Sequence, residues 1–207
     1  MTPHDMRKPS VKGLARKESI VRVATDLFVD RGYGETSTAE IASAAGILKG
    51  SLYYYFSSKE EILFTVLLRN HHSLSQFVIG DIDYSAVGSL DGLRTFVSRH
   101  VTFVLDHLEV SRLYARNVAA VRSVAEWWAP LAMARQAHET FLVDLIRRGQ
   151  DCGDMWEDED ALLAARAILS MANATQRWHH DSGGSARARI AAHHATLAVR
   201  ALKASSP

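Results

Sequence analysis

The residues best suited to contacting another molecule lie together in one short stretch: Lys49, Gly50, Ser51, Tyr53 and Tyr54. A lysine ammonium group can contact a phosphate oxygen or a guanine edge. Tyrosine hydroxyls can reach phosphate oxygens, and tyrosine rings can pack against thymine methyl groups. The glycine permits close approach because it has no side chain, whereas Ser51 is equally compatible with a plain place on a helix surface. This combination of residue types is suited to contacting double-stranded DNA.

The tyrosines also have a plainer interpretation, in which they only pack inside the protein. Three of them follow one another, Tyr53 to Tyr55, and such a run could fill a core. On a helix, however, Leu52 and Phe56 already occupy the buried face, because residues four apart lie one above the other. We therefore expect Tyr53 and Tyr54 to face outward, whereas Tyr55 is equally suited to packing and to DNA contact.

The spacing of small and apolar residues around this stretch is that of two helices joined by a tight turn. Ala42 leaves room where the helices cross, and Gly46 tolerates a positive φ in the turn. Apolar residues stand at the positions that would face a preceding helix: Ile41, Ala45, Ile47, Leu52 and Tyr55. The sequence therefore predicts a helix-turn-helix.

Residues 38–42 (TAEIA), 46–56 (GILKGSLYYYF) and 58–60 (SKE) resemble the DNA-binding signature of the tetracycline-repressor (TetR) family of transcription regulators. The resemblance covers about residues 16–68. It implies a homodimer that binds palindromic operator DNA, acts as a repressor and responds to a small molecule.

The same resemblance assigns roles to individual positions. In the family, the positions that match Lys49, Tyr53 and Tyr54 face the major groove. Those that match Thr38 and Lys59 lie at helix N-termini beside phosphates, where backbone N–H groups and the helix dipole favour an anion. Lys8, Lys12, Arg16 and Lys17 could add phosphate contacts. The chain departs from the family at Leu48, where a serine or another capping residue is usual.

Apolar periodicity and the scarcity of breakers predict an all-α protein of nine helices, three in front and six behind. We expect helices over about 16–31, 37–46, 49–56, 58–78, 93–105, 109–121, 130–150, 160–179 and 186–203. The expected division is a flexible basic arm at 1–14, a helix-turn-helix DNA-binding domain at 15–58, and a ligand-binding and dimerisation domain at 59–207.

Composition narrows the class of protein further. Residues 1–59 carry nine Lys/Arg against six Asp/Glu, and the rest carries fifteen against seventeen, a weak DNA-binding signal. Cys152 is the one cysteine, so no intrachain disulfide is possible. The N-terminus has no apolar signal segment, and no run approaches the roughly 20 apolar residues of a membrane span. We therefore expect a cytoplasmic protein, associated with the nucleoid when bound to DNA, that has no membrane partner.

The resemblance places the dimer surface on the last two expected helices. Small residues make the first of these helices narrow: Ala161, Ala164, Ala165, Ala167, Ala172 and Ala174. An apolar stripe runs along the second: Ile190, His194, Leu197, Ala198 and Ala201. The alternative is that these faces pack within one protomer.

A pocket for a small apolar effector is expected among the middle helices. The candidate wall residues are Phe103, Tyr114, Trp127, Trp128, Phe141 and Trp178. Aromatic residues at helical spacing are more often ordinary core than ligand site, so each of these residues has that alternative.

The effector is expected to be a fatty-acyl or similar CoA thioester. Residues 45–53 look closest to a branch of the family that controls lipid and sterol breakdown, and so does Arg177-Trp178-His179 followed by Gly183-Gly184. That branch often has a proline in this link, and here there is none. Arg112, Arg116 and Arg177 could meet the CoA phosphates, although each could also be a solvated side chain or part of an ion pair.

Other classes of function have less support. No nucleophile elbow, phosphate-binding glycine loop or metalloprotease helix is present, so we expect no enzyme and no cofactor. Six of the ten histidines form three adjacent pairs, and His100 and His107 lie two turns apart, so none of these pairs matches a compact metal site on one helix. The remaining alternatives are a drug-responsive repressor of an efflux gene and a DNA-binding protein without an effector.

Overall fold

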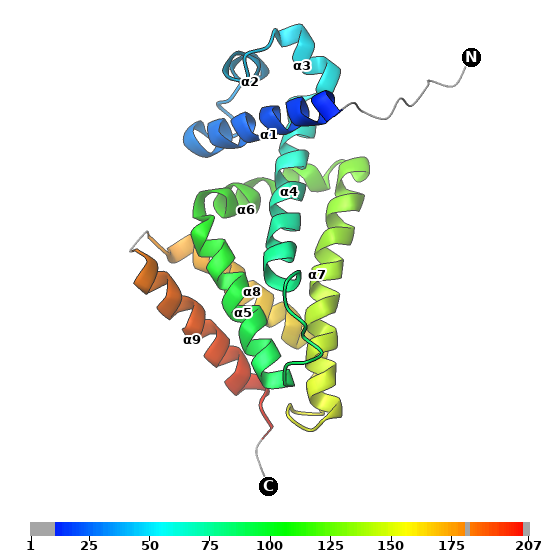
Figure 1. Cartoon of the computed structure of the whole chain (residues 1–207), viewed down its shortest axis with the longest axis vertical. Coiled ribbons are helices and arrows are strands. Elements are labelled where there is room, and N and C mark those ends of the chain that lie inside the picture. Colours follow the sequence, from blue (N-terminus) through cyan, green and yellow to red (C-terminus); the bar gives the residue numbers. More distant parts are fainter. Residues whose placement is uncertain (1–10, 181–182, 205–207) are drawn as a thin grey trace, which may run out of the picture.

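A computed structural model describes residues 11–180 and 183–204, and these form nine helices without a β-sheet (Figure 1). The expected all-α class is confirmed. The helices are α1 (Val11–Arg31), α2 (Thr38–Ala44), α3 (Lys49–Tyr55), α4 (Lys59–Ile79), α5 (Ser89–Asp106), α6 (Leu108–Arg122), α7 (Ala125–Asp151), α8 (Ala161–Trp178) and α9 (Gly184–Leu202).

The first helix begins earlier than the sequence suggested. Residues 11–14, which we expected in the flexible arm, are the first turn of α1, and residues 1–10 lie outside the described part of the chain. Extending a helix gains one hydrogen bond for each residue that is fixed, whereas starting one fixes several residues for a single bond. Because Ile20 and Ala24 anchor α1 with fully buried side chains, the turn at residues 11–14 extends an existing helix.

The long helix α7 also begins before its expected start at Pro130. It starts at Ala125 and includes the proline in its second turn. Proline lacks the N–H that a helix interior needs, so the sequence favoured it as a first-turn residue. The backbone N–H groups of Trp127 and Trp128 nevertheless donate to the Val124 carbonyl at 3.1 and 2.8 Å. Both tryptophans pack against the apolar core that joins α1–α4, which stabilises this additional turn.

Local signals fix the turns of the helix-turn-helix. Ser37 caps α2 in a capping box: its side chain accepts the Glu40 N–H, and the Glu40 carboxylate accepts the Ser37 N–H. Gly46 adopts a φ of +65° in the turn between α2 and α3, the left-handed region that favours glycine. Leu48 precedes α3 and makes no side-chain cap bond, as its departure from the family pattern implied.

The helices are arranged in two parts that share α4. Figure 1 shows α1, α2 and α3 at one end of the molecule, with α4 running from them into the larger body. Within the body, α5 is central and contacts α4, α7, α8 and α9. The last helix, α9, lies along α5 on the outside of the body (Figure 1).

Two apolar cores hold this arrangement together. One lies in the body between α4, α5, α7, α8 and α9, and includes Phe96, Leu142 and Ile146. The other, here called the N-terminal core, joins α1–α4 and also contains three buried residues of α6 and α7: Leu113, Val121 and Leu131.

Candidate DNA-binding surface and effector cavity

The second helix of the helix-turn-helix, α3, divides its side chains between a buried and an open face. Leu52 and Phe56 are each 1% exposed, whereas Tyr54 is 83% and Tyr53 is 49% exposed. Tyr55 is half-buried and packs against the N-terminal core. The two predicted outward tyrosines therefore face solvent, and the ambiguous third tyrosine packs inside.

The other predicted contact residues share this open face. Lys49, Gly50 and Ser51 are exposed in the first turn of α3. A Cβ atom at Gly50 would meet nothing within 4 Å, so packing inside the protein does not require a glycine there. The Tyr53 hydroxyl lies 3.3 Å from Thr38 Oγ1, a hydrogen bond that links α3 to the first residue of α2.

The ammonium group of Lys59 is bound within the protein. Its Nζ donates to the carbonyls of Tyr33 at 2.8 Å and Thr36 at 3.0 Å, and it lies 4.3 Å from the centre of the Tyr33 ring. These contacts hold the loop between α1 and α2 against the start of α4. An anion beside Lys59 would instead meet the N-terminus of α4, because Lys59 is the first residue of that helix. The Ser58 side chain caps this end by accepting a hydrogen bond from the Glu61 N–H.

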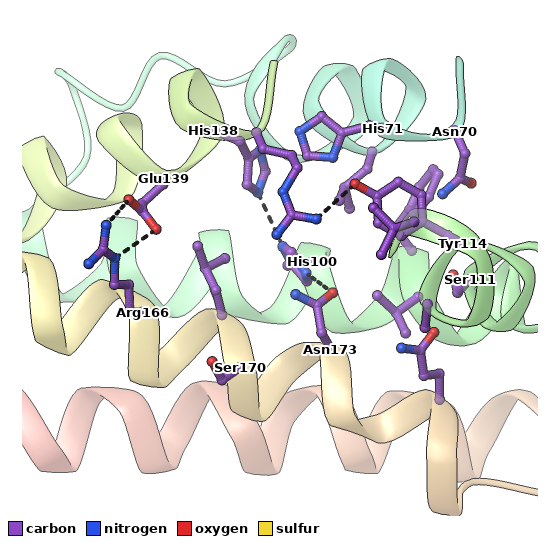
Figure 2. Close-up of a pocket in the computed structure, with 18 of the residues that line it drawn as sticks. Asn70, His71, His100, Ser111, Tyr114, His138, Glu139, Arg166, Ser170 and Asn173 are labelled. Atoms are coloured by element: carbon purple, nitrogen blue, oxygen red, sulfur yellow. Dashed lines mark hydrogen bonds and ion pairs between the residues drawn. The ribbon is translucent and has the colours of Figure 1, made fainter. Parts of the chain in front are cut away.

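A cavity of about 730 Å³ lies in the body, walled by α4, α5, α6, α7 and α8 (Figure 2). Its size suits a drug-sized or cofactor-sized molecule. Phe103, Tyr114 and Trp128, three of the six predicted wall residues, line it. Its apolar lining consists of Leu74, Phe103, Val104, Ala115, Val118, Trp128, Ala132 and Leu169.

The other three predicted wall residues lie elsewhere. Trp127 stacks on Phe64 in the N-terminal core, with ring centroids 6.4 Å apart. Phe141 packs against the core of the body. Trp178 is 51% exposed and stacks on His194 at 6.2 Å. Their aromatic character therefore supports packing, the alternative that the sequence left open.

The cavity is more polar than the sequence suggested, because three side chains of a row of hydrogen-bonded residues line it: His100, His138 and Asn173. Ser75 Oγ lies 3.1 Å from His138 Nδ1, His138 Nε2 lies 3.2 Å from His100 Nδ1, and His100 Nε2 lies 3.1 Å from Asn173 Oδ1. These four residues, here called the histidine network, come from α4, α7, α5 and α8. Figure 2 shows His138, His100 and Asn173 of this network. The network ties four walls of the cavity together.

The network has one consistent direction. The Asn173 oxygen can only accept, so His100 Nε2 carries the proton and donates. In a neutral ring His100 Nδ1 then accepts from His138 Nε2, and His138 Nδ1 accepts from the Ser75 hydroxyl. Burial lowers the pKa of His100 to about 4 and, together with the nearby histidines, that of His138 to about 2. Both rings are therefore neutral near pH 7.

Three arginines and one carboxylate line the cavity. Arg135 Nη1 donates to the Tyr114 hydroxyl at 3.1 Å, and Arg166 pairs with Glu139 at 3.2 Å (Figure 2). Arg177 is exposed at the wall. The other two arginines expected near an effector do not line the cavity. Arg112 instead donates to the carbonyls of Gln176 and His179 at the end of α8, and Arg116 is exposed on α6.

The comparisons with known proteins agree with this geometry. Residues 20–66 match the bacterial regulatory proteins of the tetR family, and residues 88–202 match the tetracyclin repressor-like C-terminal domain. The chain belongs to the TetR family of bacterial transcriptional regulators. This is a family of DNA-binding regulators, not of enzymes.

Relatives of this TetR-family protein match over most of their length. The transcriptional repressor KstR2 of Mycolicibacterium smegmatis is 26% identical over 88% of this chain and 86% of its own. A TetR-family regulator from Rhodococcus RHA1 superposes with a TM-score of 0.80 at 28% identity, covering 92% of this chain and 98% of that one. The ketosteroid regulator KstR2 of Mycobacterium tuberculosis shares the fold, with a TM-score of 0.75 at 23% identity over 92% and 96% of the two chains.

In this TetR-family protein the cavity and the DNA-binding part share side chains. Tyr114, Val118 and Trp128 line the cavity and also pack against the N-terminal core. A molecule that moves any of them therefore presses on the packing of α1–α4. The sequence could not show this double role, because it depends on where α6 and α7 meet α4.

The last two helices expose apolar side chains in the single protomer. Leu163 on α8 is 60% exposed, and Leu197 on α9 is 40% exposed. The predicted α9 stripe does not lie on one surface, because His194 and Ala198 are buried inside the protomer at 7% and 1% exposure. For these two residues the alternative of packing within one protomer is correct, because α9 turns that side toward α5.

Among the described residues, no group of three or more histidine, cysteine or acidic side chains is arranged to hold a metal ion. None of the described helices combines the length and the apolar character needed to span a membrane.

Proposed function

We propose that this TetR-family regulator is a cytoplasmic repressor that binds a palindromic operator as a homodimer. We further propose that it leaves DNA when an amphipathic small molecule, a CoA thioester of an apolar acid, fills the cavity. The observation that carries the proposal is that Tyr114, Val118 and Trp128 serve both the cavity and the N-terminal core.

The open face of α3 supports the DNA-binding part of the proposal. Lys49, Gly50, Ser51, Tyr53 and Tyr54 are exposed together on this short helix, in the position of a recognition helix. Tyr54 is the more exposed of the two outward tyrosines, and a base contact from it would supply sequence discrimination. The N-termini of α2 and α4, at Thr38 and Lys59, would meet flanking phosphates through backbone N–H groups.

Exposed leucines on the last two helices support the homodimer. Leu163 and Leu197 are large apolar side chains that one protomer leaves in water. A second copy that covers both pairs of helices would bury them in a four-helix interface. Dimerisation would also place two copies of α3 on one face, which a two-fold operator requires.

The charge and the shape of the cavity support an acidic amphipathic effector. Eight apolar side chains could surround a hydrocarbon part, and Arg135 and Arg177 could meet anionic groups. The ketosteroid regulator among the relatives is compatible with a lipid-like ligand. A cationic drug has less support, because Glu139 is the carboxylate of the lining and is already paired with Arg166.

Release from DNA follows if the effector binds best to a conformation in which the spacing of the two recognition helices does not match successive major grooves. A hundredfold loss of operator affinity requires about 2.7 kcal/mol of coupling, and DNA must weaken effector binding by the same factor. This coupling would act through Trp128, which the effector would displace toward the N-terminal core.

The proposal is tested by first selecting bound sequences from a random DNA pool with the full chain. Gel shifts with the selected operator then compare acyl-CoA thioesters, free fatty acids and planar aromatic cations. Release by a CoA thioester is the expected result. Release by an aromatic cation, with no response to any thioester, would replace the proposal with a drug-responsive repressor, and no release by any compound would favour a regulator without an effector.

A matched pair of variants shows whether release depends on the cavity. Ala132 lines the cavity, and Ala137 is exposed on the same helix outside it. Ala132→Trp should fill the cavity and abolish release while operator binding remains, whereas Ala137→Trp should behave as wild type. Equal release from both variants would contradict the assignment of the effector to this cavity.

A further inference from the structure

One wall residue of the cavity, His71, stands outside the histidine network and carries an unused polar atom. Its side chain lies on α4 and is buried, with 8% exposure. Its Nε2 is shielded from solvent and has no hydrogen-bond partner. Most buried polar groups in proteins are paired, so an unpaired one on a residue that lines the cavity calls for a partner.

The chemistry of the missing partner follows from the state of the His71 ring. Burial, the largest effect, lowers the pKa of His71 to about 4 against an opposing backbone hydrogen bond at Ala134, so the ring is neutral near pH 7. With Nε2 unpaired, Nδ1 is the nitrogen available for that backbone bond and therefore carries the proton. Nε2 is then a lone-pair acceptor, and its partner must bring an O–H or N–H group.

Two groups near His71, the Tyr114 hydroxyl and the Arg135 guanidinium, can donate hydrogen bonds. The Tyr114 ring is stacked on the His71 ring with centroids 6.3 Å apart, and its hydroxyl oxygen accepts from Arg135, which leaves the hydroxyl proton free to donate. Figure 2 shows the hydroxyl end of Tyr114 on the His71 side of the cavity. An acceptor and a donor on neighbouring stacked rings match a group that both gives and receives a hydrogen bond.

We propose that His71 and Tyr114 form a subsite for an alcohol group of the effector. His71 Nε2 accepts a hydrogen bond from the alcohol O–H, and the Tyr114 hydroxyl donates one to the alcohol oxygen. The inference rests on the proposed function, because it places this subsite inside the effector cavity. It also narrows the effector class from an amphipathic acid derivative to one that carries a hydroxyl on its apolar part.

Other polar groups fit this place less well. A ketone has no proton and would leave His71 Nε2 unpaired. A carboxylate would direct its lone pairs at the lone pair of Nε2, and protonating the ring to relieve this conflict is opposed by burial and by Arg135. An ammonium group would donate to Nε2 but would also lie beside the positive charge of Arg135.

The test uses small probes that can take any position in a cavity of this size: cyclohexanol, cyclohexanone and methylcyclohexane. They share a ring and differ in whether they offer a donor, only an acceptor, or neither. Each is titrated into the full chain labelled with ¹⁵N-histidine, and the His71 Nε2 resonance is followed, with its assignment made from His71→Gln. Saturable movement with cyclohexanol alone is expected, whereas no movement, or equal movement with all three probes, would overturn the subsite.

Two variants separate a hydrogen bond from general packing. The wild type should bind cyclohexanol about fivefold more tightly than cyclohexanone, the ratio that one ordinary hydrogen bond supplies. His71→Gln retains an acceptor and should keep much of this preference, whereas His71→Leu should reduce the ratio to about one. His72→Leu, a change at the exposed neighbour outside this cavity, is the control and should keep the wild-type ratio. A ratio unchanged in His71→Leu would overturn the proposal.

This test and the test of the proposed function fail separately. A CoA thioester that releases DNA from a protein whose His71 ignores cyclohexanol would leave the function intact and remove the alcohol subsite. An alcohol-selective response at His71, with no release by any thioester, would leave the subsite intact and remove the CoA effector.

Discussion

Replacing His138 by leucine removes the middle of the histidine network while leaving an apolar side chain of similar size in a buried place. Two hydrogen bonds are lost, to Ser75 and to His100, and each is worth about 1 kcal/mol net. His100 is only 2% exposed, so its Nδ1 is left buried and unpaired, which costs about 1–3 kcal/mol more. The leucine recovers part of this through apolar burial, so the free energy of unfolding should fall by about 2–3 kcal/mol.

The same substitution at His71 provides the comparison. The Nε2 of His71 has no partner, so leucine there removes an unsatisfied buried atom, loses only the backbone hydrogen bond at Ala134 and leaves the network whole. The free energy of unfolding should then stay within about 1 kcal/mol of wild type. Urea unfolding at pH 7.5, followed by circular dichroism at one fixed protein concentration, measures both variants, because the stability of a dimer depends on concentration.

Two outcomes would refute this reasoning. If His138→Leu is as stable as wild type, the hydrogen bonds of the network add nothing to the free energy of unfolding. If His71→Leu loses as much stability as His138→Leu, the unpaired state of His71 Nε2 is wrong and this atom has a partner in the folded protein.

Further predictions concern DNA binding, assembly and pH. Tyr54→Ala and Lys49→Ala should each weaken specific operator binding by about 1–3 kcal/mol with the fold intact, and gel-shift titration at fixed salt checks this; wild-type affinity would remove α3 as the recognition helix. Lys59→Ala should lower the thermal stability of the N-terminal part, because the loop carbonyls lose their donor. Leu163→Glu should give folded monomers in sedimentation, whereas Ala198→Glu should unfold the protomer because that position is buried. The three cavity histidines stay neutral in the folded protein while the unfolded chain binds their protons, so stability should fall as pH drops from about 6.5 toward 4, by at most about 1.4 kcal/mol per pH unit for each. Urea midpoints from pH 7.5 to 5 measure this slope, and a flat profile speaks against neutral burial.

The helix-turn-helix could be predicted because its signals are local. The small residue at Ala42, the turn at Gly46 and the buried positions of α3 all lie within 15 residues of one another. The start of α7 could not be predicted in this way. Proline at 130 is a strong local signal, but tertiary packing of Trp127 and Trp128 against the N-terminal core outweighs it.

The cavity was only partly predictable for the same physical reason. Aromatic residues mark packing in general, and the sequence does not tell whether Phe141 meets a ligand or another ring. The histidine network was missed altogether. His100 and His138 are 38 residues apart on different helices, and only the crossing of α5 and α7 brings their rings within 3.2 Å. Counting histidines along one helix cannot detect such a pair.

The composition of the N-terminal core has a consequence for engineering. Builders of biosensors join the DNA-reading part of one regulator to the sensing part of another, and the start of α4 is the obvious seam. In this protein such a seam would separate α1–α3 from Leu113, Val121 and Leu131, which are buried in the same core. A working chimera must carry the corner between α6 and α7 along with the DNA-reading helices. The exchangeable unit is therefore defined by a packing surface and not by a cut point in the chain.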